Sequence, residues 1–228
     1  MIGVLTYGKP HRKTTDLVLG LVARGIKPHI ITTLWEERKN HIPLYPHRPT
    51  GGIDPSVMAK NLGLPITHLA HVNQFKYEEL DRVLIGGAGI LPKEVISLCP
   101  FINAHPGLLP EVRGLDALKW SIYEDQLIGV TVHQVGEEAD TGHVISRQII
   151  EPKLLEDFYH LAMRVYELEI KLLIDSIEAG RHLASRQELT AQYKPHRRMK
   201  HAEEVVMMDR YKLKQLGVIS WHTGMEGL

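Results

Sequence analysis

Short apolar runs and one helix-like segment alternate along the first part of the chain. Residues 2–6 form a compact apolar run that ends in a Tyr-Gly-Lys-Pro turn, which is typical of a buried strand. Apolar residues over 17–22 then follow helical spacing, and we expect Thr14 or Thr15 to cap this helix. A second β-rich run covers 28–33. Strand, helix and strand in this order predict a βαβ unit, and therefore a parallel sheet with helices on its faces.

The same order of elements continues, interrupted by one long loop. Residues 36–55 hold four prolines and a Gly-Gly pair among polar residues, which predicts a loop. The longest helix is expected from 155 to Gly180, and a weaker one over 203–216. Further expected strands lie near 65–69, 82–85, 101–103, 129–135 and 143–150, and further expected helices near 56–62, 92–98 and 115–123. We therefore predict an α/β fold with a Rossmann-like, mostly parallel sheet.

Composition narrows the class of protein. Lys+Arg and Asp+Glu number 27 each, so the chain lacks the bulk positive charge typical of nucleic-acid-binding proteins. The single Cys99 can form neither an internal disulfide nor a thiolate zinc site. No apolar run approaches the roughly 18 residues of a membrane helix. We expect a cytoplasmic globular protein without a membrane or nucleic-acid partner.

The segment with the clearest chemistry follows the strand expected at 101–103. Asn103 and His105 are two residues apart, so an extended backbone places both side chains on one side. In open α/β sheets, ligands bind beyond the carboxyl ends of the strands. Asp140 lies further on, in a carboxylate-rich loop that also follows a strand. Taken alone, an Asn-x-His pair is more often an ordinary turn with a surface histidine, so the three residues are only a candidate acyl-transfer site.

A wider set of motifs carries a resemblance to a known family. The sequence reads Asn-x-His-Pro-x-Leu-Leu-Pro over 103–110, Arg-Gly at 113–114, Gly-x-Thr-Val-His over 129–133 and Asp-x-Gly at 140–142. This pattern resembles the N10-formyltetrahydrofolate-dependent formyltransferases. That family includes glycinamide ribonucleotide transformylase, methionyl-tRNA formyltransferase, sugar N-formyltransferases and the related formyltetrahydrofolate hydrolases. The resemblance implies the formyltransferase fold, with a catalytic domain over 1–182 and a C-terminal extension over 183–228.

The resemblance also implies a catalytic group and a co-substrate pocket. Asn103 and a protonated His105 would donate hydrogen bonds to the oxyanion that forms as an amine attacks the formyl carbon. Asp140 would orient His105 or a water and pass protons. The co-substrate N10-formyltetrahydrofolate supplies an activated formyl group, so no metal is expected. The folate pocket would be lined by Ala88, Gly89, Ile90, Leu91, Val135, Gly136, Glu137 and Glu138.

The acceptor region departs from the purine-pathway members. Their Gly-x-Gly-Ser-Asn turn is replaced here by a basic turn, in which Lys9 and Arg12 precede the first expected helix. With Arg113 they are the expected substrate contacts, and the Pro-rich loop 43–55 is a further candidate. A nucleotide-linked amino sugar is the first expectation for the acceptor. The basic cluster over 194–198 is interpreted as a solvated face rather than a binding site.

Several alternatives remain open at this stage. Glycinamide ribonucleotide is the second candidate acceptor, and a formyltetrahydrofolate hydrolase would keep the same three catalytic residues. A non-catalytic folate-binding module ranks low because all three residues are present. Formylation of tRNA is disfavoured, since that branch resembles a longer chain with a separate RNA-contacting domain. The C-terminal extension is a candidate dimer element or substrate lid, so a homodimer is conceivable.

Overall fold

A single twisted sheet organises the chain in the computed structural model, which describes residues 1–34, 42–77, 79–178, 188–189 and 191–221. Within these ranges the sheet has eight strands in the order β3-β2-β1-β4-β5-β6-β7-β8. The strands are β1 (Ile2–Tyr7), β2 (His29–Thr33), β3 (Ile66–Leu69), β4 (Arg82–Ile85), β5 (Phe101–His105), β6 (Gly129–Val135), β7 (Gly142–Ile149) and β8 (Glu188–Leu189). The α-helices are α1 (Arg12–Ala23), α2 (Pro55–Leu62), α3 (Lys93–Ile96), α4 (Ala117–Tyr123), α5 (Phe158–Asp175) and α6 (His201–Gln215).

The direction of the strands changes at β5. The first five strands across the sheet, from β3 to β5, run parallel to one another. Parallel neighbours cannot be joined by a tight hairpin, so the chain crosses over the sheet between them. From β5 onward the pairs are antiparallel, and β6 and β7 form a hairpin with a register shift between Val132 and His133. The predicted α/β fold with a mostly parallel sheet is confirmed.

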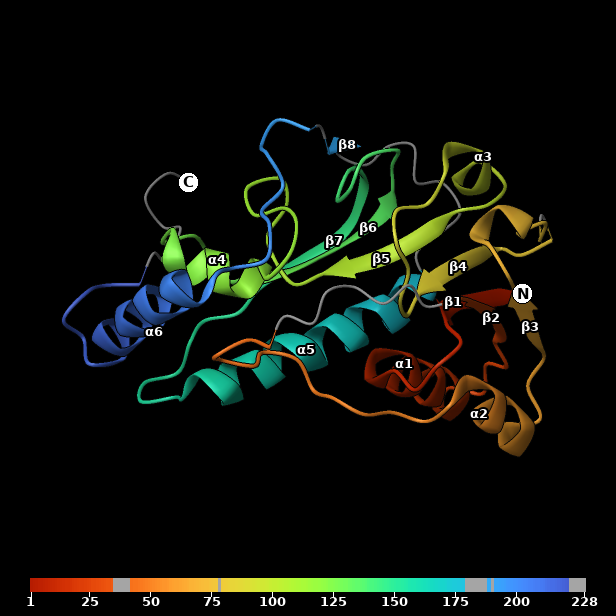
Figure 1. The fold of residues 1–228 in the computed structure, drawn as a ribbon, viewed down its shortest axis with the longest axis horizontal. Helices are drawn as coiled ribbons and strands as arrows, with labels where there is room; N and C mark the ends of the chain where they lie inside the picture. The colour runs from red at the N-terminus through yellow and green to blue at the C-terminus, as the bar shows by residue number, and fades with distance from the viewer. Residues whose placement is uncertain (35–41, 78, 179–187, 190, 222–228) are drawn as a thin grey trace.

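Successive residues of β1 face opposite layers. Val4 packs in a cluster with Leu17 of α1 and Leu173 of α5, whereas Leu5 packs on the other face with Phe75 and Phe101. Figure 1 shows α1, α2 and α5 on one side of the sheet and α3 on the other. Burying each such large apolar side chain contributes about 1.5–3 kcal/mol, so both layers hold the sheet in place.

The first helix begins earlier than its sequence indicates. Its N-cap is His11, and Thr14 and Thr15 lie inside the helix with their side chains buried. The Thr14 hydroxyl bonds Thr6 on β1 and the His11 ring, so it ties the helix to the strand instead of capping it. The predicted threonine cap was therefore wrong, because the hydroxyls are used in tertiary contacts.

The C-terminal part of the chain packs on the same body. Strand β8 pairs with β7, and α6 packs against α4. Lys119 of α4 and Glu204 of α6 form a fully buried ion pair, and Glu204 also accepts a 2.6 Å hydrogen bond from the Leu44 amide. The predicted boundary between 182 and 183 lies outside the described residues, and the division into two domains stays a prediction. Within the described ranges, no helix combines the length and apolar character needed to cross a membrane.

Candidate active site

The end of β5 brings two polar side chains to a large cavity. Asn103 and His105 are separated by one residue, and both line a cavity of about 800 Å³. Ala104 between them is buried in the core cluster on the helix-covered face, and its carbonyl accepts a 3.3 Å hydrogen bond from the Lys13 side chain on α1. The two-residue spacing thus places the carboxamide and the imidazole on one face of the strand, as the extended backbone predicts.

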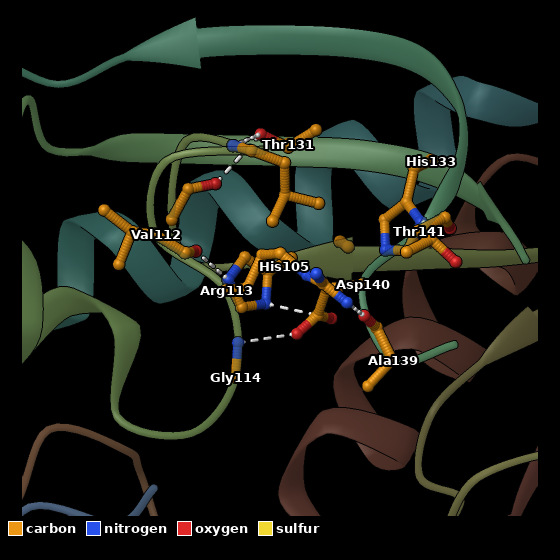
Figure 2. A network of polar contacts seen from close by, with 12 residues as sticks. His105, Val112, Arg113, Gly114, Thr131, His133, Ala139, Asp140 and Thr141 are labelled. Atoms are coloured by element: carbon orange, nitrogen blue, oxygen red, sulfur yellow. Dashed lines mark hydrogen bonds and ion pairs between the residues drawn. The ribbon is translucent and has the colours of Figure 1, made fainter. Parts of the chain in front are cut away.

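Two acceptors hold the His105 ring. Its Nε2 donates to the Val112 carbonyl at 2.7 Å, and its Nδ1 lies 3.3 Å from Oδ1 of Asp140. Figure 2 shows His105 and Asp140 pointing toward one another. A carbonyl and a carboxylate oxygen both accept hydrogen bonds, so a ring that carries a proton on each nitrogen could donate to both. The two contacts hold the imidazole and the carboxylate face to face at the cavity.

Asp140 reaches His105 by an indirect route. Strand β6 is antiparallel to β5, so Gln134 near its carboxyl end pairs with Ile102 and not with His105. The loop after β6 folds back over the sheet, where the Thr141 carbonyl accepts a 3.0 Å hydrogen bond from the His133 ring. Asp140 takes a positive φ of 54° in this loop. Gly142 also has a positive φ, and a Cβ there would lie 2.0 Å from the Gln134 carbonyl oxygen, so the turn requires glycine.

The Gly114 amide and the Arg113 side chain hold the Asp140 loop in place. Oδ2 of Asp140 accepts a 2.7 Å hydrogen bond from the Gly114 amide. The guanidinium of Arg113 donates to the carbonyls of Ala139 at 2.6 Å and Tyr193 at 2.7 Å. Arg113 is buried and outside the cavity lining, so in this structure it joins three segments of backbone. This placement differs from the substrate contact expected of Arg113 from the sequence.

His133 forms the floor of the cavity next to Asn103. The two residues are cross-strand partners, and both line the cavity. Burial lowers the pKa of His133 to about 4, although Asp140 acts in the opposite direction. The ring is therefore neutral near pH 7, with Nδ1 donating to Thr141. Its Nε2 is buried without a hydrogen-bond partner among the described residues, which leaves one acceptor directed at this part of the site.

The residues expected to hold the folate all lie at this cavity. Its lining includes every one of the eight, namely Ala88, Gly89, Ile90, Leu91, Val135, Gly136, Glu137 and Glu138. Ile90 is largely exposed, and a side chain added at Gly89 would meet no atom within 4 Å. Apolar side chains beside accessible backbone suit a flat heterocycle with hydrogen-bonding edges. The lining thus fits the co-substrate that the sequence implies, and the binding role of these residues stays a prediction.

Further lining residues come from three other segments, of which the Pro-rich loop 43–55 was a candidate contact from the sequence. The loop after the undescribed 35–41 segment contributes His47 and Arg48, the start of α4 contributes Asp116, and the C-terminal segment contributes His196 and Arg198. No local pattern marks these residues, because they meet only through tertiary contacts. The cluster over 194–198, interpreted from sequence as a solvated face, thus also contributes to the cavity wall.

Lys9 and Arg12 are not brought to the cavity lining. The Arg12 guanidinium lies 2.8 Å from the Asp16 carboxylate one turn along α1, and its side chain is exposed. Within the described residues, no group of three His, Cys, Asp or Glu side chains could hold a metal ion. The sequence also has two histidines three residues apart, His68 and His71, and the ring of His68 bonds the Thr32 hydroxyl at 2.7 Å.

Comparisons with known proteins agree on one family. The model of the family described as "Formyl transferase" matches residues 70–177. A methionyl-tRNA formyltransferase from Desulfotalea psychrophila is 33% identical over 132 residues, which cover 54% of this chain and 41% of that protein. A second, from Campylobacter fetus, is 30% identical over 147 residues, which cover 56% of this chain and 48% of that protein. The chain thus spans less than half the length of these curated relatives.

Solved structures share the fold over a larger part of the chain. A sugar N-formyltransferase from a Shewanella species aligns with a TM-score of 0.59 at 18% identity, covering 92% of this chain and 87% of that one. A phosphoribosylglycinamide formyltransferase from Bacillus halodurans aligns with a TM-score of 0.58 at 18% identity, covering 80% of this chain and 99% of that one. At this identity the likeness shows the fold alone.

Proposed function

Because the chain belongs to the formyltransferase family through residues 70–177, we propose that it transfers a formyl group from N10-formyltetrahydrofolate to a primary amine of a small-molecule acceptor. The observation that carries this proposal is the meeting of Asn103, His105 and Asp140 at one cavity, with Nδ1 of His105 3.3 Å from Asp140. The three groups come from a strand end and from a loop that folds back over the sheet.

Asn103 and His105 would stabilise the charge that develops on the formyl oxygen when an amine attacks the formyl carbon. The Asn103 carboxamide makes no hydrogen bond to another described residue and lines the cavity, so its N–H groups are available to that oxygen. A protonated His105 would donate a second hydrogen bond to the same oxygen. Its Nδ1–H makes the longer of its two contacts, so this is the donor that a substrate oxygen would share. Losing one such donor costs about 3 kcal/mol in comparable sites.

Asp140 would have two tasks in the reaction. Its carboxylate stabilises the charged form of His105, and it can receive a proton from the attacking amine and return it to the leaving folate nitrogen. Proton transfer of this kind contributes roughly 10²–10⁴-fold to a rate. The Gly114 amide on its second oxygen fixes the carboxylate in one orientation, so the oxygen near His105 keeps its place during the transfer.

The acceptor we propose first is a nucleotide-linked amino sugar. The likeness in fold extends over 92% of the chain for the sugar N-formyltransferase from Shewanella, and the turn that follows β1 lacks the glycine-rich motif of the purine-pathway members. Glycinamide ribonucleotide is the second candidate, supported by the likeness to the Bacillus halodurans structure. A formyltetrahydrofolate hydrolase would use the same three side chains with water in place of the amine.

An acceptor screen tests the proposal. The purified chain is supplied with N10-formyltetrahydrofolate and, in separate reactions, with several nucleotide-linked amino sugars, with glycinamide ribonucleotide or with no acceptor. We expect folate release that depends on an amino sugar and a product heavier by one formyl group. Release at the same rate without any acceptor would instead identify a hydrolase. Absence of release in every reaction, together with no binding of a non-reactive folate analogue, would contradict the proposal.

A further inference from the structure

Several cations line the cavity besides the residues expected to hold the folate. Lys13 and Arg48 both contact the carboxylate of Glu169 on α5, with Lys13 at 2.7 Å. Arg198 lies 3.4 Å from Oδ1 of Asp116. These three cations and two carboxylates together carry one positive charge in excess. The other acids of the lining have partners of their own, because Glu137 pairs with Lys93, Glu138 lies 3.7 Å from Arg113 and Asp140 faces His105. Because this surplus faces a cavity, it is available to a ligand rather than dispersed in bulk solvent.

The two carboxylates leave much of each guanidinium unused. Glu169 is 1% exposed and Asp116 is 4% exposed, so both acids are buried behind their cations. The Arg48 and Arg198 side chains remain 38% and 44% exposed. Their ion pairs with described residues use Nη1 of each guanidinium, which has five N–H donors in a planar fork. The remaining donors can bind an anion in the cavity.

The pKa values of two nearby histidines are lowered in part by the same cations. Burial first, and then Arg48, Lys119 and Arg198, hold the pKa of His47 well below its ordinary value. Burial first, and then Lys13, Arg48 and Lys9, lower the pKa of His11 to about 4 against an opposing effect of Glu169. Both rings are therefore neutral near pH 7, and they can accompany an anion as hydrogen-bond partners.

Contacts with the C-terminal part of the chain hold both arginines in place. The His201 ring donates to the Ile42 carbonyl at 2.8 Å, and this bond joins the Glu204–Leu44 contact in fixing the loop that carries Arg48. The Met199 amide, next to Arg198, donates to Oδ2 of Asp116 at 2.9 Å. His47 approaches Oδ1 of the same carboxylate at 3.7 Å, so the two cation-bearing segments meet at Asp116. A site built in advance on fixed backbone loses less entropy on binding.

The reacting groups lie close to this wall. His47 and Arg48 line a small pocket together with Pro106, the residue after His105, and with Glu169. Lys13 bonds the carbonyl between Asn103 and His105. We infer that Arg48 and Arg198 form an anion subsite that binds a phosphate group of the amine acceptor while its amine faces Asn103, His105 and Asp140. This inference rests on the proposed function, and it names the acceptor as a phosphorylated small molecule.

Titration with inorganic diphosphate at constant ionic strength tests the subsite in the full chain. We expect diphosphate to bind the wild-type protein and to bind Arg198→Gln at least ten-fold more weakly. Arg197→Gln is the matched control, because Arg197 is the neighbouring arginine, pairs with Glu203 at 2.5 Å and does not line the cavity. Arg48→Gln leaves Glu169 with Lys13 alone and can impair folding, so Arg48→Lys is measured as well. Arg48→Lys should fold like the wild type but bind diphosphate more weakly, because lysine lacks the guanidinium fork.

The results separate the subsite from the proposed function. A non-reactive folate analogue should bind all variants equally. Failure of the analogue to bind, with diphosphate binding still sensitive to Arg198, would reject the function and keep the anion site. Absent diphosphate binding, or equal weakening in Arg197→Gln and Arg198→Gln, would overturn the subsite. A nucleoside diphosphate should displace inorganic diphosphate, and displacement only by an RNA hairpin would overturn the small-molecule source of the phosphate.

Discussion

Replacing Asp140 by Asn tests the role that we propose for the contact between His105 and the Asp140 carboxylate. Asparagine has the shape of aspartate, so its carbonyl oxygen can still accept the Gly114 amide. Its amide group would then face Nδ1 of His105 as a donor, at the 3.3 Å position now occupied by a carboxylate oxygen. Nδ1 would have to accept that hydrogen bond, while Nε2 continues to donate to Val112. In the variant Nδ1 accepts instead of donating, so the site loses the donor that we propose for the substrate oxygen.

The expected cost follows from that loss. Removing one charge-stabilising donor costs about 3 kcal/mol, which corresponds to a rate about 100-fold lower, and the lost proton transfer contributes roughly 10²–10⁴-fold. We expect kcat for formyl transfer to fall by at least about 100-fold in Asp140→Asn, with binding of a non-reactive folate analogue within about two-fold of wild type. Single-turnover rates and calorimetry measure the two quantities.

A matched substitution controls for the loss of one negative charge. Asp209→Asn makes the same chemical change on an exposed position of α6, outside the cavity lining, and should keep the wild-type rate. If Asp140→Asn transfers formyl groups within two-fold of the wild-type rate, the reasoning about His105 is refuted. It is also refuted if rate and folate-analogue binding fall together by the same factor, because Asp140 would then act on binding rather than on the reaction.

Two further predictions concern stability. Lys119→Met leaves the fully buried carboxylate of Glu204 without its cation, so the free energy of unfolding in urea should fall by about 3–5 kcal/mol. The double variant with Glu204→Gln should recover more than half of this loss, and no recovery would contradict the pairing. His133 has its folded-state pKa lowered to about 4 by burial. Above the unfolded-state pKa near 6.5, His133 is neutral in both states and does not lower the free energy of unfolding. As pH drops from 6.5 to 4, the free energy of unfolding should fall by up to about 3 kcal/mol, because only the unfolded chain binds the proton. His133→Gln should flatten this dependence, and parallel pH curves for the two proteins would refute it.

The sequence predicted one edge of the site for a physical reason. A β5 strand that ends at His105 puts its alternate side chains on one face, so Asn103 and His105 were located by spacing and by the position of strand ends. The same rule cannot place Asp140, because β6 is antiparallel and its carboxyl end lies beside Ile102. The position after a strand made Asp140 a candidate and the resemblance to a family gave it a role, but the fold-back of its loop explains the contact with His105.

Long-range contacts account for what the sequence did not predict. Arg48 and Arg198 are 150 positions apart, and each reaches the cavity through backbone bonds that α6 and Asp116 make with its segment. Arg113 looked like a substrate contact because it is a cation next to the motif. Its burial beneath the Asp140 loop, with bonds to Ala139 and Tyr193, depends on a C-terminal segment that no local pattern connects to it.

The stretch 70–177, which matches the formyl transferase family model, lacks several of the contacts that hold the site. A fragment confined to it would contain His105 and Asp140, but it would lack the lysine beneath the Ala104 peptide. It would also lack the Tyr193 carbonyl that secures Arg113 and the His196 backbone that flanks Gly114, the partner of the Asp140 carboxylate. A fragment chosen by its match to the family model would therefore keep His105 and Asp140 but lose contacts that hold them in position.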